Sequence, residues 1–178
     1  MQFEPLLLEG AFLIHFKNFM DERGAFCKTF NDAIFKEQGI DFELKESYFS
    51  LSQKDVVRGM HFQLPPHDHA KIVFCPQGSI LDIMVDLRKD SKTYGQYYKA
   101  ILSAENALGY YIPKGFAHGF KSLEDGAMTY YLVSSGYHPA SDTGILWDSF
   151  GMDWELEAPI ISSRDLSFVS LSDFNSPF

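Results

Sequence analysis

The sequence predicts an all-β protein of the sandwich or jelly-roll class, and two observations lead to this prediction. Aromatic residues make up 16% of the 178 residues, with 17 Phe and 9 Tyr, and β-strands favour such side chains. Short apolar runs alternate with turn residues, and no helical segments of crossover length separate them. We therefore expect antiparallel strands packed in two layers, within one domain that spans residues 1–178.

The expected strands follow one another along most of the chain. They cover residues 48–52, 71–75, 79–86, 97–102, 107–112, 127–133 and 143–146, and shorter apolar runs lie at 12–14 and 25–30. Segments rich in Gly, Pro, Asn and Asp supply turns at 76–78, 103–106, 113–115 and 124–126. Residues 31–39 begin with Asn-Asp and end with Gly, which predicts a short helix. The tail from residue 159 is expected to close the fold.

Composition excludes several classes of partner. The formal net charge is −9 and no run of Lys or Arg occurs, which argues against nucleic-acid binding. No apolar run approaches the ~20 residues that span a membrane, and the first residues lack the pattern of a signal peptide. Cys27 and Cys75 stand far apart in no CxxC spacing, so we expect two reduced, buried thiols. These features together predict a cytoplasmic protein.

Polar residues that could bind a metal or transfer a proton are concentrated in two segments. Residues 57–71 read VRGMHFQLPPHDHAK, and residues 111–120 read YIPKGFAHGF. The first hypothesis is a metal site, in which His67 and His69 would converge with His118 as in metal-binding cupins. Against it, no Glu follows the histidine pair, and Lys71 places a cation where a divalent ion would sit. The second hypothesis is metal-free proton transfer.

The segment 79–86 carries two acidic residues with a spacing of four. Strand alternation places Asp82 and Asp86 on one face of the sheet. We expect both carboxylates to face solvent or a neighbouring Arg.

Several longer motifs favour proton transfer, because in order and spacing they resemble the dTDP-4-dehydrorhamnose 3,5-epimerase family. The motifs are RGMHFQLPP, KIVFCPQGSILDIMVDLRKDSKTYG, LSAENALGYYIPKGFAHGF and GYHPASDTGILW, with FMDERGAF before them and ISSRD after them. The resemblance extends from about residue 19 to residue 165. It implies a cupin-type jelly-roll β-sandwich with a few short helices. It also implies an isomerase that needs no metal or cofactor, and a homodimer in which N-terminal segments cross between subunits.

The implied reaction inverts C3, C5 or both in a nucleotide-linked 4-keto-6-deoxy sugar, in deoxysugar assembly for surface glycans. Such a reaction needs a base on one face of the sugar, an acid on the other, and a cation or donor at the enolate oxygen. By the resemblance, His61 is the base and Asp165 orients it. Tyr131 is the acid, and Lys71 stabilises the enolate with His118 close by.

The resemblance also assigns the nucleotide end of the substrate, a nucleoside diphosphate. Arg23 and Arg58 match phosphate-binding positions, a task that suits the guanidinium group. Phe19 and Phe26 match positions around the base, and Tyr137 matches a position that lines the pocket.

The chain departs from the family pattern at four positions near the substrate. Lys28 stands where the family usually has Glu, Glu46 and Tyr48 stand for Gln and Asn, and His69 stands for Gln. Lys28 can only donate hydrogen bonds, whereas Glu would accept one from thymine. We therefore hypothesise an altered nucleotide or sugar. Two other functions stay open: a metal-dependent cupin enzyme using His67, His69 and His118, and a non-catalytic cupin that binds sugar nucleotides.

Overall fold

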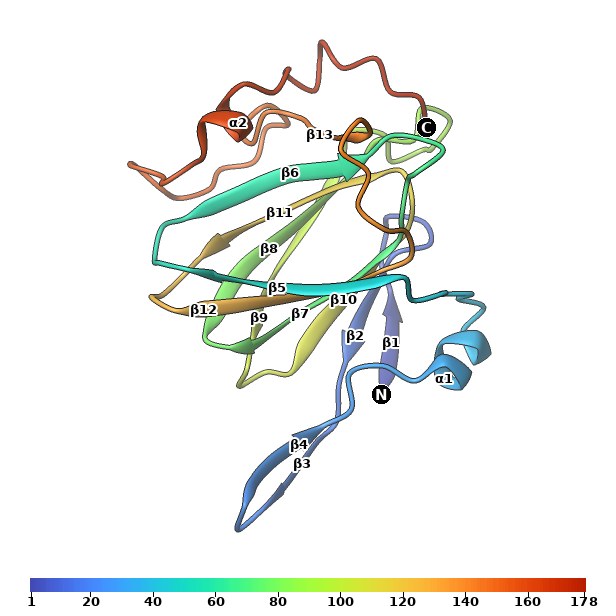
Figure 1. The fold of residues 1–178 in the computed structure, drawn as a ribbon, viewed down its shortest axis with the longest axis vertical. Helices are drawn as coiled ribbons and strands as arrows, with labels where there is room; N and C mark the ends of the chain where they lie inside the picture. The colour runs from blue at the N-terminus through green and yellow to red at the C-terminus, as the bar shows by residue number, and fades with distance from the viewer.

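The computed structural model describes residues 1–178 and contains two antiparallel sheets stacked as a sandwich (Figure 1). The six-stranded sheet has the order β1 (Gln2–Pro5), β2 (Phe12–His15), β10 (Leu108–Ile112), β7 (Lys71–Gln77), β12 (Ala127–Val133), β5 (Glu46–Ser52). The five-stranded sheet has the order β13 (Asp142–Gly144), β6 (Val57–Gln63), β11 (Phe116–Ser122), β8 (Ser79–Asp86), β9 (Tyr97–Ser103). The predicted jelly-roll β-sandwich is confirmed.

The remaining elements lie outside these two sheets. Strands β3 (Asn18–Asp21) and β4 (Gly24–Cys27) form a hairpin that projects away from the sandwich (Figure 1). Helix α1 (Asp32–Glu37) lies within the predicted segment 31–39, and the side chain of Asn31 caps it by accepting from the Ile34 N–H. Helix α2 (Ser163–Leu166), in the C-terminal tail, was not predicted.

Every strand predicted at 48–52, 71–75, 79–86, 97–102, 107–112, 127–133 and 143–146 is present, and β8 and β12 have the predicted bounds. Strands β6 and β11 were not predicted as strands. Both carry the polar clusters described above, and histidine, glycine and charged residues there obscure the apolar pattern of a strand. The two strands that bear the chemistry were therefore the hardest to recognise.

Period-2 alternation divides the apolar residues of the strands among three layers. One residue set, including Tyr110, Phe120 and Met84, packs between the two sheets. The opposite face of the six-stranded sheet packs against the region of α1 through residues such as Phe35. The opposite face of the five-stranded sheet is covered by the C-terminal segment, including Trp154. Both sheets are thus covered on two faces over much of their area.

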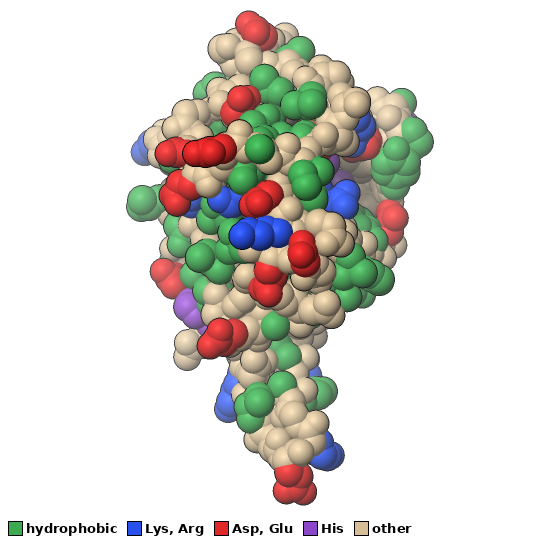
Figure 2. Space-filling view, turned by 90° about the vertical axis from the view of Figure 1, so that its left-hand side faces the viewer, with side chains coloured by type: hydrophobic (Ala, Val, Ile, Leu, Met, Phe, Trp, Pro, Cys, Tyr) green, Lys and Arg blue, Asp and Glu red, His purple; other side chains and the backbone are tan.

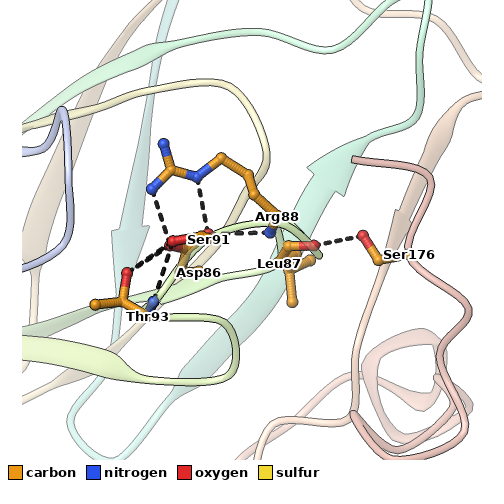
Figure 3. A network of polar contacts seen from close by, with 6 residues as sticks. All are labelled: Asp86, Leu87, Arg88, Ser91, Thr93 and Ser176. Carbon is orange, nitrogen blue, oxygen red and sulfur yellow. Dashed lines mark hydrogen bonds and ion pairs between the residues drawn. The ribbon is translucent and has the colours of Figure 1, made fainter.

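The two acidic residues of β8 are fully buried, so the expectation that they face solvent is wrong. Asp86 does meet a neighbouring Arg, because its oxygens accept from Arg88, Ser91 and Thr93 at 2.6–3.0 Å (Figure 3). Asp82 instead contacts a histidine, as described below. Asp82 and Asp86 do lie on the same face of β8, as strand alternation predicted, but that face points into the sandwich.

Both cysteines are free thiols, and Cys75 is buried while Cys27 is half-buried. No helix has the length and apolar character needed to cross a membrane.

Candidate active site

A cavity of about 380 Å³ opens between the two sheets, and both sheets contribute side chains to its wall. The five-stranded sheet contributes residues from β6, β11 and β13, and the six-stranded sheet contributes residues from β5, β7 and β12. The polar and aromatic lining residues are Glu46, Tyr48, Ser50, Arg58, His61, Phe62, Gln63, His69, Lys71, His118, Tyr131, Ser135, Tyr137, Asp142 and Arg164. The cavity therefore holds most of the residues that the sequence singled out.

His61 lies on β6 and pairs with Asp165, which the chain supplies from 104 residues away. The ring Nε2 lies 2.8 Å from Oδ1 of Asp165, and the Gly59 N–H donates to the other carboxylate oxygen at 3.2 Å. Burial alone would raise the pKa of Asp165, but the hydrogen bonds from His61 and Gly59 lower it. An ionised carboxylate only accepts, so the proton of the neutral ring lies on Nε2 and the lone pair lies on Nδ1.

Local backbone geometry allows Asp165 to reach this position. Ser162 caps α2 by accepting from the Asp165 N–H at 3.1 Å, which fixes Asp165 in the first turn of the helix. Gly59 has φ of +147°, and a Cβ there would come within 2.7 Å of the Cα of Gly119 on β11. Only glycine permits this close approach of β6 and β11, which carry His61 and His118 as cross-strand neighbours.

Tyr131 lies on β12, in the sheet opposite the one that carries His61. It is 8% exposed, and its ring stacks on Tyr48 of β5 with 4.8 Å between centroids. Burial raises the pKa of the Tyr131 hydroxyl, and the charge of Asp82 adds to this effect. The hydroxyl therefore stays protonated near neutral pH and can donate a proton from the wall opposite His61.

Lys71 is a buried cation at the start of β7, and its Nζ donates to the backbone carbonyl of His61 at 3.1 Å. Burial lowers its pKa to about 8, while the charges of Asp142 and Asp82 partly oppose that shift. The ammonium group is thus present at neutral pH, next to the backbone of His61. A cation there suits an oxygen that gains negative charge.

His118 on β11 forms a second carboxylate–histidine pair, with Asp82 of β8. Its Nε2 lies 2.9 Å from Oδ1 and 3.0 Å from Oδ2 of Asp82, and both residues are buried. Burial raises the pKa of Asp82 and lowers the pKa of His118, because it opposes the charged form of each group.

Arg58 and Tyr137 line the same cavity. The Nε of Arg58 donates to the Ser52 hydroxyl at 3.1 Å and a terminal nitrogen donates to the Leu51 carbonyl at 3.4 Å. Tyr137 is 64% exposed, and its backbone N–H donates to the carboxylate of Glu46 at 2.8 Å. Glu46 and Tyr48, two of the departures from the family pattern, therefore lie at the cavity wall.

Four predicted substrate-binding residues lie elsewhere. Phe19, Arg23 and Phe26 are on the β3–β4 hairpin, and Lys28 follows it directly. None of the four lines the cavity of their own chain. The side chains of Phe19 and Phe26 are 52% and 62% exposed, and Arg23 pairs only with its neighbour Asp21. Figure 2 shows the hairpin standing clear of the body of the molecule.

The three histidines of the metal hypothesis do not converge. His67 stacks on His138 with 3.6 Å between ring centroids, the Nδ1 of His69 faces Gln63 at 3.0 Å, and His118 is held by its carboxylate. No group of three His, Cys, Asp or Glu side chains is arranged to hold a metal ion. The geometry does not favour the metal hypothesis.

Sequence reasoning missed a polar pair at the rim of the cavity. Arg164 donates to Asp142 at 2.7 Å, and both side chains line the cavity. Arg164 stands directly before Asp165 in the ISSRD segment, and Asp142 stands in the GYHPASDTGILW segment. Both motifs had been noted, but nothing in the spacing indicates that these two side chains meet.

The fold is a jelly-roll β-sandwich whose cavity carries a histidine–carboxylate pair, and comparisons with known proteins show its family. A family model described as dTDP-4-dehydrorhamnose 3,5-epimerase matches residues 5–173. The protein of that name from Methanothermobacter thermautotrophicus is 42% identical over 171 residues, covering 93% of this chain and 92% of its own. The chain therefore belongs to the dTDP-4-dehydrorhamnose 3,5-epimerase family.

Solved structures show the same relationship. A Legionella pneumophila 3,5-epimerase, determined in complex with dTDP-4-keto-L-rhamnose, has a TM-score of 0.93 and 34% identity, covering 98% of this chain and 94% of its own. A 3'-monoepimerase from Streptomyces bikiniensis, in complex with dTDP-quinovose, has a TM-score of 0.89 and 32% identity, covering 94% and 87%. Proteins of this fold thus include both double and single epimerases.

Proposed function

We propose that the chain inverts C3, C5 or both in a nucleotide-linked 4-keto-6-deoxy sugar, by proton transfer without a metal. The observation that carries the proposal is the placement of His61 and Tyr131 on opposite sheets, both lining one cavity. Inversion at a carbon needs a proton removed from one face and returned to the other. The substrates in the names of the relatives support the choice of sugar nucleotide.

In the proposed reaction, Nδ1 of His61 removes the proton from the carbon next to the C4 ketone. The electrons of the C–H bond move into the ring bond, and the C4 oxygen becomes an enolate. Lys71 stabilises this oxygen as it gains charge. Tyr131 then donates its proton to the opposite face of the carbon, and the ketone is restored. Asp165 holds the His61 ring in the tautomer that can accept a proton.

The test is solvent deuterium incorporation into dTDP-4-keto-6-deoxyglucose, with the enzyme treated with EDTA beforehand. We expect deuterium at C3, C5 or both, and the labelled carbon shows which centre is inverted. Loss of exchange after EDTA, restored by added metal, would instead support a metal-dependent enzyme. Binding of the sugar nucleotide with no exchange would support the non-catalytic alternative.

The identity of the nucleobase in the substrate is a separate prediction. Lys28 is exposed and follows a hairpin that carries two exposed aromatic rings. It can donate to the acceptor edge of cytosine or guanine but cannot accept from thymine. Competition binding with dTDP, CDP and GDP tests this prediction. A clear preference for dTDP would exclude an altered base, and Lys28→Glu is the matched variant, expected to move the preference toward dTDP.

We also propose a homodimer in which each hairpin completes the cavity of the partner. The hairpin projects from its own body, exposes Phe19 and Phe26, and carries Arg23 away from its own cavity. Exposed apolar side chains on a projecting ribbon favour an interface between chains.

A hybrid-dimer experiment tests the exchange directly. His61→Ala removes the base from the β-sandwich, and Arg23→Ala removes a proposed phosphate contact from the hairpin. The homodimer of each variant should therefore be impaired. After the two variants are mixed through unfolding and refolding, half of the dimers are hybrids, each with one intact site. Activity should then recover to about a quarter of the wild-type value. No recovery from a mixture that is dimeric by light scattering would exclude exchange.

Two further proposals concern the whole chain. We propose that residues 1–178 form one domain, which predicts a single cooperative unfolding transition by circular dichroism.

We propose a cytoplasmic location, supported by the two free thiols. Recovery of the protein outside the cytosolic fraction of its native cell would exclude that location.

A further inference from the structure

His69 is a half-buried histidine for which the reaction described above has no role. It precedes β7 by two residues and lines the same cavity as Lys71 and His118. Its Nδ1 lies 3.0 Å from Nε2 of Gln63. Its Nε2 is buried and has no hydrogen-bond partner in the protein. A buried polar group left without a partner is rare, and it calls for a ligand or a role.

The surroundings of Gln63 fix the proton on the His69 ring. The Oε1 atom of Gln63 accepts from the His138 N–H at 2.6 Å, and its Nε2 donates to the backbone carbonyls of His67 at 2.8 Å and Gly136 at 3.2 Å. The Gln63 amide therefore has one orientation, with its NH2 group toward His69. Nδ1 of His69 must accept, so the neutral ring carries its proton on Nε2.

The ring also stays neutral across the working pH range. Burial lowers the pKa of His69 to about 3, and the nearby charges of Lys71, Lys114 and His118 act in the same direction. His69 thus keeps an uncharged, unpartnered N–H donor on a ring that lines the cavity. The cations of Lys71 and Lys114 make that corner of the cavity suitable for an oxygen with negative charge and unsuitable for another cation.

We propose that the Nε2–H of His69 donates a hydrogen bond to the C4 oxygen of the substrate, as the second donor beside Lys71. The inference rests on the proposed function, because that oxygen becomes the enolate. A carbonyl or enolate oxygen can accept two hydrogen bonds, and a fixed neutral donor strengthens its contact as the charge develops. Gln63 is then a positioning residue, since it sets the tautomer of the donor.

Two substitutions separate this role from a structural one. His69→Leu removes the donor at similar volume, and it should lower kcat by about 100-fold while the affinity for dTDP alone stays within about threefold. His69→Gln keeps a neutral N–H donor, and it should retain kcat within about tenfold of wild type. The pH profile of His69→Gln should match that of wild type, because His69 does not titrate in the working range.

Unchanged kcat in His69→Leu would overturn the proposal. So would an equal loss of dTDP affinity, which would assign His69 to the nucleotide end. A pH profile of His69→Gln that differs from that of wild type would also overturn it, because His69 would then titrate during the reaction.

A measurement on the wild-type protein covers the case in which His69→Leu does not fold. In protein labelled with 15N-histidine, the His69 signals are assigned by their absence in His69→Gln. We expect the Nε2–H tautomer from pH 5 to 8, and a shift of that proton on adding the 4-keto sugar nucleotide but not on adding dTDP. The Nδ1–H tautomer, or equal shifts with both ligands, would overturn the proposal. If wild type exchanges no deuterium, the proposed function fails, while a shift specific to the keto sugar still supports the contact.

Discussion

Two carboxylate–histidine pairs of almost identical length lie near the cavity, and they differ in their access to it. His61 and Asp165 are 2.8 Å apart, and the His61 side chain is 29% exposed. His118 and Asp82 are 2.9 Å apart, with side chains 3% and 0% exposed. Hydrogen bonds lower the pKa of Asp165 against the effect of burial, whereas burial raises the pKa of Asp82.

In the proposed mechanism, this difference in burial, rather than pair geometry, separates the base from a supporting group. Asp165 stays anionic and directs an accessible lone pair on His61 toward the cavity. Asp82 and His118 are enclosed, so charge separation in that pair is opposed by desolvation. Asp82 also helps to maintain the cation of Lys71, whose pKa it raises. We therefore expect the first pair to govern the rate and the second to govern stability.

The largest effect is expected for His61→Ala. Removing the base should lower the rate of deuterium exchange by about 10³- to 10⁴-fold, since the other acceptors on that wall, His118 and Asp142, are held by Asp82 and Arg164. The affinity for dTDP, measured by calorimetry, should stay near the wild-type value and serves as the control. Exchange at the wild-type rate would show that the His61–Asp165 pair is not the base.

Substitution of the two carboxylates should have opposite consequences. Asp165→Asn should lower kcat by about 100-fold, because an amide no longer enforces the Nε2–H tautomer. Asp82→Ala should mainly lower the free energy of unfolding, by about 3 kcal/mol, because it leaves His118 buried without its partner. Activity assays and urea unfolding of both variants are the measurement. Equal effects on rate and stability in the two variants would erase the distinction between the pairs.

Lys71 gives the comparison a pH dependence. Its pKa of about 8 in the folded protein means that the cation predominates below pH 8 and is lost as pH rises through that value. The rate should therefore fall above about pH 8. Lys71→Arg should remove this limb, even at a lower kcat, because Arg stays protonated. The raised pKa of Tyr131 keeps its hydroxyl protonated there, so a limb that persists in Lys71→Arg would contradict the assignment.

The smallest effect on catalysis is expected at Asp86, which lies on the same strand as Asp82 but outside the cavity. Its hydrogen bonds to Arg88, Ser91 and Thr93 join the end of β8 to the following loop (Figure 3). Asp86→Asn should lower the free energy of unfolding by about 1–2 kcal/mol and leave kcat unchanged. A loss of rate beyond about threefold would indicate that this network supports the site.

The sequence predicted the sandwich well, because strand alternation is local information. It identified β8 and β12 with their full bounds, yet it missed β6 and β11, where His61 and His118 interrupt the apolar pattern. The family resemblance, rather than the strand pattern, identified Asp165 as the partner of His61. The pairing of Asp82 with His118, and the partnerless Nε2 of His69, depend on the meeting of strands distant in the sequence. No spacing rule contains that information.

The central claim is that base and acid act from opposite sheets, and Tyr131→Phe in D2O tests it most directly. With the acid removed and His61 intact, we predict that deuterium still enters at the carbon next to the ketone while inversion is lost. Exchange would then occur with retained configuration, because His61 returns deuterium to the face it took the proton from. Inversion by Tyr131→Phe at the wild-type rate would contradict the account.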